Sequence, residues 1–168
     1  MENSILYSEA QRFRQWWIWA VLMLINGLSF SGLVYQVFLG NEFGNNPTSD
    51  YFLILTCMIS VTMSFLLLQL KLETKISKEG ISLRFFWFHL SYRQYKWEEI
   101  KKAYIREYSP IGEFGGWGIR GFYKNRAFNV SGNIGLQLEF IGGRKLLIGT
   151  QKPGEITRIL KSLNIYQE

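Results

Sequence analysis

The stretch "YFLILTCMISVTMSFLLLQLKLETKIS", residues 51–77, changes its pattern once. Residues 51–70 carry no charged side chain and are apolar on every helical face, which is typical of a membrane-spanning helix of about 20 residues. From Lys71 onwards charged residues appear and apolar residues alternate with polar ones, which is typical of a β-strand. The sequence therefore predicts a membrane part followed by a β-rich part.

A second uncharged run precedes the first, at residues 16–39, "WWIWAVLMLINGLSFSGLVYQVFL". It is also long enough to span a bilayer with some tilt, so we predict two transmembrane helices, 16–39 and 51–70. A cleaved signal peptide is the alternative for the first run. The apolar region of such a peptide has about 7–15 residues and ends in an A-x-A cleavage pattern, and this run is longer and has no such pattern after it.

Basic residues flank both runs on the same side, at Arg12, Arg14, Lys71, Lys75 and Lys78. The connecting loop, residues 40–50, has no Lys or Arg. The positive-inside rule therefore predicts a cytoplasmic N-terminal segment (residues 1–15), an extracytoplasmic loop and a cytoplasmic β-rich domain (residues 71–168) in the inner membrane. Neither run contains an ionisable residue, which argues against a transporter or proton channel.

Small residues recur at helical spacing in both runs, at Gly27 and Ser31 and at Thr56, Ser60 and Ser64. Residues four apart share one helix face, so each run has a stripe along which another helix packs closely. We expect the stripes to pack against each other in an antiparallel hairpin. The alternatives are dimerisation and contact with a partner's helix.

The part from Lys71 onwards holds 17 basic residues and nine glutamates, a formal charge of about +8. Alternation predicts strands at 81–87, with Ile81, Leu83, Phe85 and Trp87 on one face, and at 134–141, followed by a hairpin with a two-residue loop at Gly142-Gly143. Further strands are predicted at 73–77, 92–97, 101–108, 118–123 and 127–130. Ile156, Ile159, Leu160 and Leu163 have helical spacing and predict one amphipathic C-terminal helix.

About seven short antiparallel strands closed by one helix is the order of a pleckstrin-homology-like (PH-like) domain. The chain resembles small bacterial membrane proteins that join a two-helix hairpin to a bacterial PH-like domain. The resemblance is carried by "EGISLRF" (79–85), "WEEI" (97–100), "GGWGIR" (115–120) and "LLIGTQKP" (146–153). It implies an α+β domain built as a split or bent barrel capped by the helix, with a binding or scaffolding role.

Gly116, Gly118 and Gly121 match the G-x-G-x-x-G fingerprint of a dinucleotide-binding turn. A true fingerprint opens a helix and has an acidic residue about 20 positions later, whereas here strand-like residues follow. We therefore interpret Gly115, Gly116, Trp117, Gly118 and Gly121 as a structural turn. The neighbouring "RGFYKNRAF" departs from the RNA-recognition pattern, so no nucleic-acid partner is expected.

Catalytic and metal-binding residue types are scarce after Lys71: there is no Asp, no Cys and one histidine, His89. Metal clusters, a Ser/His/Asp triad and a Cys/His pair are therefore not available there. Glu98 and Glu99 are adjacent, so on a strand they point to opposite faces. The single cysteine, Cys57, lies in an apolar run. We predict no enzymatic activity, no catalytic or metal site and no cofactor.

Basic residues tethered close to an anionic leaflet predict a membrane or ligand surface. The candidates are Lys75, Lys78, Arg84, Lys101, Lys102, Arg106, Lys124 and Arg126. Lys78 and Arg84 match the ends of the eukaryotic phosphoinositide pattern, but Ser82 replaces its middle basic residue. The expected partner is an anionic phospholipid surface, a membrane protein or both. The alternative interpretation is that these charges lie on solvated strand faces.

The sequence does not specify an oligomeric state. The alternative function is that of an accessory subunit that acts through its hairpin on a membrane protein partner.

Overall fold

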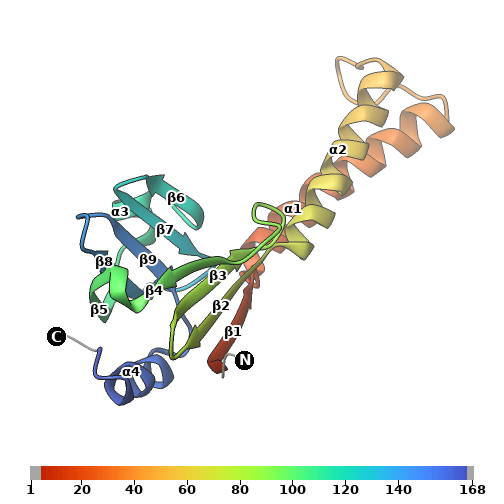
Figure 1. The fold of residues 1–168 in the computed structure, drawn as a ribbon. Helices are drawn as coiled ribbons and strands as arrows, with labels where there is room; N and C mark the ends of the chain where they lie inside the picture. Colours follow the sequence, from red (N-terminus) through yellow and green to blue (C-terminus); the bar gives the residue numbers. More distant parts are fainter. Residues whose placement is uncertain (1–4, 166–168) are drawn as a thin grey trace. The chain divides into compact units, whose positions relative to one another are not determined.

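The computed structural model describes residues 5–165, and the chain divides into two units. One unit, here called the helical hairpin, is Arg14–Gln69. The other, here called the β domain, combines the chain before Arg14 with the chain from Leu70 onwards. The β domain is therefore built from two segments that the hairpin separates in the sequence (Figure 1).

The helical hairpin contains α1 (Trp16–Gly32), a π-helical segment (Leu33–Phe38) and α2 (Asp50–Gln69). Both helical stretches, Trp16–Phe38 and Asp50–Gln69, are long and apolar enough to cross a membrane. This confirms the two long apolar helices that the uncharged runs predict.

Asn26 of α1 makes polar contacts with two serines of α2. Its Nδ2 donates to Ser64 Oγ at 2.8 Å, and its Oδ1 accepts from Ser60 Oγ at 3.1 Å. The predicted Gly27–Ser31 stripe is wrong as the contact face of α1, because both residues are exposed and a Cβ on Gly27 would meet nothing within 4 Å. An amide both donates and accepts, so it bonds two serines of the neighbouring helix, which a stripe of small residues does not do.

The first sheet of the β domain has the order β1-β2-β3-β4, and all its strands are antiparallel. They are β1 (Ile5–Arg12), β2 (Lys71–Ser77), β3 (Gly80–Phe85) and β4 (Arg93–Lys96). The sequence analysis assigned no strand to residues 1–15, so β1 is a feature that it missed. It also placed Trp87 in a strand, which is wrong because β3 ends at Phe85.

The second sheet has the order β5-β8-β9-β7-β6. Its strands are β5 (Ile100–Glu107), β6 (Gly118–Phe122), β7 (Asn125–Asn129), β8 (Ile134–Phe140) and β9 (Lys145–Gly149). β7 pairs with β9 in parallel, so the expectation of about seven strands, all antiparallel, is wrong: residues 5–165 form nine strands with one parallel pair. These strands make two separate sheets rather than one closed barrel.

The predicted hairpin near Gly142-Gly143 is confirmed as the antiparallel pair β8 and β9. Its loop is longer than the predicted two residues, because Phe140 N–H donates to Arg144 O and Gly143 N–H donates to Phe140 O. Gly143 has a φ of 77°, the left-handed conformation typical of three-residue hairpin loops.

Short helices complete the β domain. They are the 3₁₀ turn η2 (Trp97–Glu99), α3 (Pro110–Phe114) and α4 (Pro153–Ser162). The helix α4 confirms the predicted amphipathic C-terminal helix, with Ile156 and Leu160 fully buried. The sequence analysis did not predict η2 or α3.

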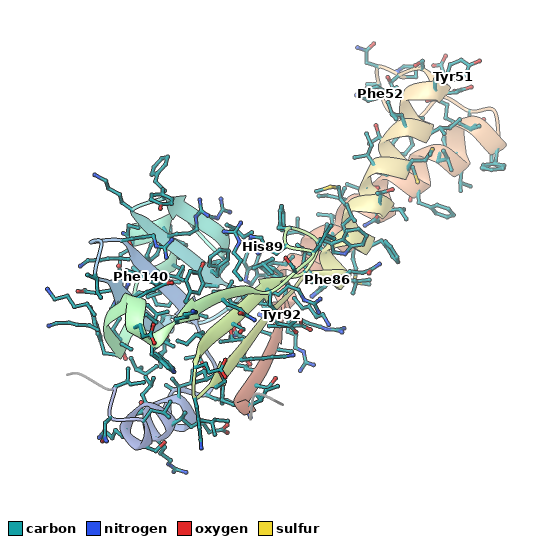
Figure 2. All side chains as sticks on the ribbon, viewed as in Figure 1. Tyr51, Phe52, Phe86, His89, Tyr92 and Phe140 are labelled. Atoms are coloured by element: carbon teal, nitrogen blue, oxygen red, sulfur yellow. The ribbon has the colours of Figure 1, made fainter. Side chains whose placement is uncertain are left out.

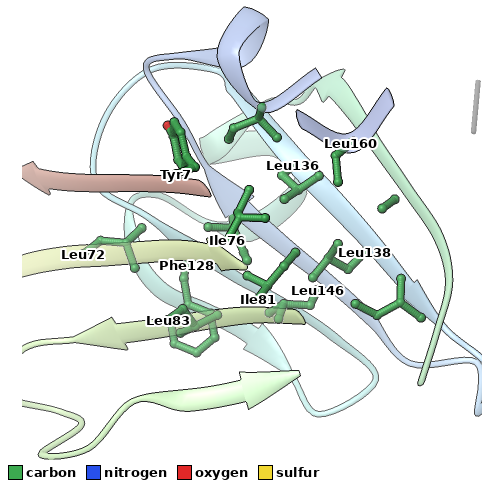
Figure 3. Packing of buried hydrophobic residues seen from close by; sticks show 14 of the residues in the cluster. Tyr7, Leu72, Ile76, Ile81, Leu83, Phe128, Leu136, Leu138, Leu146 and Leu160 are labelled. Atoms are coloured by element: carbon green, nitrogen blue, oxygen red, sulfur yellow. The ribbon is translucent and has the colours of Figure 1, made fainter. Parts of the chain in front are cut away.

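The core of the β domain lies between the inward faces of the two sheets and α4 (Figure 3). Alternate residues of β2 and β3 are buried, as expected for strands with one solvated face. The residues that fill this core include Leu72, Ile76, Ile81, Leu83, Phe128, Leu136, Leu138, Leu146, Ile156 and Leu160. The opposite face of β2 and β3 is left for polar and charged side chains.

Candidate membrane-facing surface

The outward face of the first sheet gathers basic side chains from three strands. On β2, inward Leu72, Thr74 and Ile76 alternate with outward Lys71, Glu73 and Lys75. Residues directly opposite in an antiparallel pair share a face. Cross-strand pairing therefore adds two more cations, since Arg12 lies opposite Lys71 and Arg84 lies opposite Glu73. We call Arg12, Lys71, Lys75 and Arg84 the basic face.

Glu73 is the carboxylate that pairs with two cations of the basic face, Lys71 and Arg84. Lys71 Nζ lies 2.6 Å from Glu73 Oε1, and Arg84 Nη2 lies 2.6 Å from Oε2. The Tyr92 hydroxyl also donates to Oε2, at 2.8 Å. Burial raises the pKa of Glu73, but the hydrogen bonds from Lys71, Tyr92 and Arg84 outweigh it and lower the pKa to about 2.

Two aromatic rings also hold three of the four cations of the basic face. Lys75 Nζ and Arg84 Cζ lie 4.4 Å and 4.6 Å from the centroid of the Tyr92 ring. Lys71 Nζ and Arg84 Cζ lie 5.5 Å and 5.6 Å from the Phe86 ring. Since a cation within about 6 Å of a ring is attracted to it, these side chains are held on the sheet surface. Figure 2 labels Phe86 and Tyr92 beside the loop that joins β3 to β4.

That loop, residues 86–90, is here called the aromatic loop. Trp87 is 48% exposed, Phe88 65% and Leu90 90%. Its fold is fixed by hydrogen bonds from the N–H groups of Phe88 and His89 to Phe85 O. Phe86 N–H donates to Lys71 O at 2.8 Å, which ties the aromatic loop to the first residue of β2. Solvent-exposed apolar side chains grouped this closely mark a contact surface.

His89 is the member of the aromatic loop that turns inward. Its ring centroid lies 5.5 Å from that of the core residue Phe128, and its Nδ1 accepts from Phe85 N–H at 3.4 Å. Burial, followed by the charges of Arg93 and Arg126, lowers the pKa of His89. It therefore anchors the loop as a neutral ring and leaves the apolar neighbours outside.

The predicted basic residues do not form one surface. Lys75 and Arg84 belong to the basic face, and Lys78 is exposed in the turn between β2 and β3. The others belong to the second sheet: Lys101, Lys102 and Arg106 on β5, Lys124 in the β6–β7 turn and Arg126 on β7. Sequence analysis missed Tyr92 and the aromatic loop as parts of a surface. The run of six residues "FFWFHL" (85–90), in which strand alternation stops, was the available signal.

Arg106 is held by partners within the protein. Its Nη1 and Nη2 lie 3.1 Å and 2.8 Å from the Glu113 carboxylate, and its Nε donates to Gln137 Oε1 at 3.0 Å. The guanidinium of Arg106 lowers the pKa of Glu113. This bidentate pair fixes α3 to β5, which gives Arg106 a structural role.

The glycine-rich turn joins α3 to β6. Gly115 ends α3 at a φ of 72°, and Gly116 and Gly118 also have positive φ. Trp117 Nε1 donates to Gly132 O at 3.2 Å. The last glycine of the fingerprint, Gly121, lies within β6, so the glycines open a β-hairpin and not a helix.

Replacing Gly121 with alanine is expected to lower the free energy of unfolding by at least about 2 kcal/mol, because an alanine there is strained twice. Its φ is 77°, and a Cβ would lie 2.1 Å from Asn125 O, so the backbone must move. Gly132→Ala is the matched control, with a φ of 76° and no atom within 4 Å of the added Cβ. Urea unfolding of the full chain measures both variants, and equal losses would show that the close approach at Gly121 is unimportant.

Within residues 5–165, no three His, Cys, Asp or Glu side chains gather closely enough to hold a metal ion. Comparison of the chain with protein-family models and with curated proteins found no match. The functional argument therefore depends on the geometry of the chain itself, above all on the basic face and the aromatic loop.

Proposed function

We propose that the protein is a non-catalytic membrane-anchored binding module whose β domain docks on the anionic cytoplasmic leaflet of the inner membrane. The aromatic loop enters the headgroup region, and the basic face meets the lipid phosphates. The observation that carries this proposal is the hydrogen bond from Phe86 N–H to Lys71 O. It ties the aromatic loop to a residue that follows the second apolar helix almost directly.

Chain connectivity limits how far the aromatic loop is from the bilayer. The helix α2 ends at Gln69 and β2 begins at Lys71, and two residues span at most about 7 Å. On the other segment, β1 ends at Arg12 and α1 begins at Trp16. In the proposed arrangement, the strand ends that carry Arg12 and Lys71 are within a few residues of the membrane along the chain.

The chemistry of this strand end matches the membrane interface. Trp87, Phe88 and Leu90 supply apolar surface, and aromatic rings prefer the headgroup level. Each Lys or Arg close to an anionic leaflet adds about 1 kcal/mol of attraction. The four cations of the basic face outnumber their one carboxylate, so a net positive charge remains for lipid.

The proposal includes a PH-like character for the β domain. In its support, two packed sheets are followed by a C-terminal helix that contributes Ile156 and Leu160 to the core. The four sequence segments of the resemblance fall on β3, η2, the glycine-rich turn and the β9–α4 connection. The strand β1 and the parallel pair β7–β9 go beyond the pattern of seven antiparallel strands.

The alternative function, an accessory subunit that acts through its hairpin, is favoured by one observation. Gly27 and Ser31 form a small-residue stripe on α1 that the hairpin does not use. A partner's transmembrane helix would pack closely there. In that case the β domain would be positioned by the partner and not by lipid.

Spin labels at two matched positions test the membrane docking. Leu90→Cys and Phe122→Cys, each in a Cys57→Ser background, place labels at side chains that are 90% and 89% exposed. In nanodiscs with anionic lipid, we expect the label at position 90 to be accessible to oxygen dissolved in the bilayer. The label at position 122 is expected to be accessible to a water-soluble nickel complex. Two aqueous labels would refute the docking and favour the hairpin alternative.

A further inference from the structure

A small cavity in the β domain is lined by cations from three separate strand regions. It has a volume of about 60 Å³. The residues that line it include Arg93, Tyr95, Tyr123, Arg126, Arg144 and Lys145. They come from β4 in the first sheet and from the β6–β7 hairpin and the start of β9 in the second sheet. None of the described residues that line the cavity is acidic.

Among the described residues that line the cavity, Arg126 has a buried hydrogen-bond donor without a partner. Its Nε is buried and has no hydrogen-bond partner among the described residues. A buried donor without an acceptor is costly, and the cost is greater when the group is charged. An anion in the cavity that Arg126 lines would supply the missing acceptor.

Arg144 is held by aromatic rings, and no ion pair joins it to a carboxylate among residues 5–165. Its Cζ lies 4.1 Å from the Phe140 ring centroid, 5.4 Å from that of Tyr95 and 5.8 Å from that of Tyr123. Stacking on aromatic rings orients a guanidinium and leaves its edge N–H groups for another acceptor. Lys145 differs, because Glu139 lies 3.0 Å from its Nζ.

We propose that this cavity binds the phosphate group of a phosphate-containing ligand. Three arginines line it, and a guanidinium fork matches the oxygens of a phosphate in pairs. Liquid water occupies about 30 Å³ per molecule, so the cavity has room for a single small anion. It is far smaller than the 300–1,000 Å³ or so typical of pockets for larger ligands, so the rest of the ligand lies outside the cavity.

The positive potential of the cavity also affects its neighbour His89. The charges of Arg93 and Arg126 add to burial in lowering the pKa of that ring. The site does not depend on the proposed docking of the aromatic loop, because the cavity is formed by other residues. Its phosphate comes either from a lipid headgroup or from a soluble ion, and both present the same oxygens.

The test is calorimetric titration of the full chain, in phosphatidylcholine nanodiscs, with inorganic phosphate. We expect saturable binding that Arg126→Gln and Arg144→Gln each weaken about 10-fold or more. Lys101→Gln is the matched control, because it removes one exposed positive charge from β5 and does not line the cavity. Its affinity should be unchanged.

Two results would overturn the site: no saturable binding by the unchanged chain, or an equal loss in Lys101→Gln. Arg126→Lys keeps the charge but not the fork, so weaker binding in this variant, with an unchanged melting temperature, separates recognition from misfolding. Repeating the titration in nanodiscs that contain phosphatidic acid distinguishes the sources. Loss of phosphate binding there identifies the lipid headgroup, and unchanged binding identifies a soluble phosphate.

Discussion

Deletion of β1 is expected to unfold the β domain. The strand pairs with β2 along seven residues, from Ile5 opposite Ser77 to Arg12 opposite Lys71. Its inward side chains are Tyr7, Glu9 and Gln11, which are 5%, 8% and 2% exposed. Without β1, the edge of β2 and the buried face beneath it would be open to water. A fragment that starts at Lys71 lacks β1, so binding should be measured with the full chain.

Glu9 connects β1 to the residues that follow β9. Its carboxylate accepts from the hydroxyl groups of Tyr7 at 2.6 Å and Thr150 at 2.8 Å, and from Gln151 N–H at 2.9 Å. Burial and this hydrogen bond to Glu9 raise the pKa of Tyr7 above its usual range. Gln11 adds a further bond, from its Nε2 to Gly149 O at 2.6 Å.

Glu9→Ala is expected to lower the free energy of unfolding by about 2–4 kcal/mol, because each buried donor left without its acceptor costs about 1–3 kcal/mol. Ser8→Ala is the matched control on the same strand. Ser8 is exposed, so its replacement should change stability by less than about 0.5 kcal/mol.

Urea unfolding of the full chain measures both variants, and hydrogen exchange of β2 amides shows whether β1 has detached. Equal stability of Glu9→Ala and Ser8→Ala would mean that β1 is only a loosely bound edge. In that case the deletion should also be tolerated.

The strand β1 was missed because its pattern is the reverse of the usual one. In "ILYSEAQR" (residues 5–12) the inward positions hold Tyr7, Glu9 and Gln11, and Leu6 faces outward. Alternation identifies a strand only when its buried face is apolar. The strands β2 and β3 do alternate, with a mostly apolar buried face, and the sequence predicted them. The two apolar helices were predicted from their long uncharged runs instead.

Pairing between distant strands was also beyond the reach of local pattern. The strands β7 (Asn125–Asn129) and β9 (Lys145–Gly149) pair in parallel, although β8 separates them in the sequence. Periodicity shows that each segment is a strand but contains no information about its neighbour. For the same reason, the sequence did not show that the predicted basic surface residues lie on two different sheets. The cavity that Arg126 lines forms because the fold brings Arg93 and Arg144 to it from other segments of the chain.

Glu73→Gln is expected to lower the free energy of unfolding at neutral pH. It should also make this free energy depend less on pH in the acid range. The pKa of Glu73 falls from 4.5 to about 2 on folding. A lowered pKa contributes stability above the unfolded value, and this contribution is lost as the pH falls through the folded value. The window is therefore about pH 5 to 2. The side chain is 13% exposed, so we expect a contribution of about 2 kcal/mol.

The same substitution should act on membrane docking in the opposite direction. Loss of the carboxylate leaves Lys71 and Arg84 without their shared counter-charge. Each added net positive charge close to an anionic leaflet contributes about 1 kcal/mol. The spin label at position 90 should then lie at least as deep in anionic nanodiscs. Glu107→Gln removes the same charge from the exposed end of β5 and should change neither measurement. If Glu73→Gln weakens docking as well as stability, Glu73 positions the cations for lipid, and the basic face acts as an ordered site and not as a simple sum of charges.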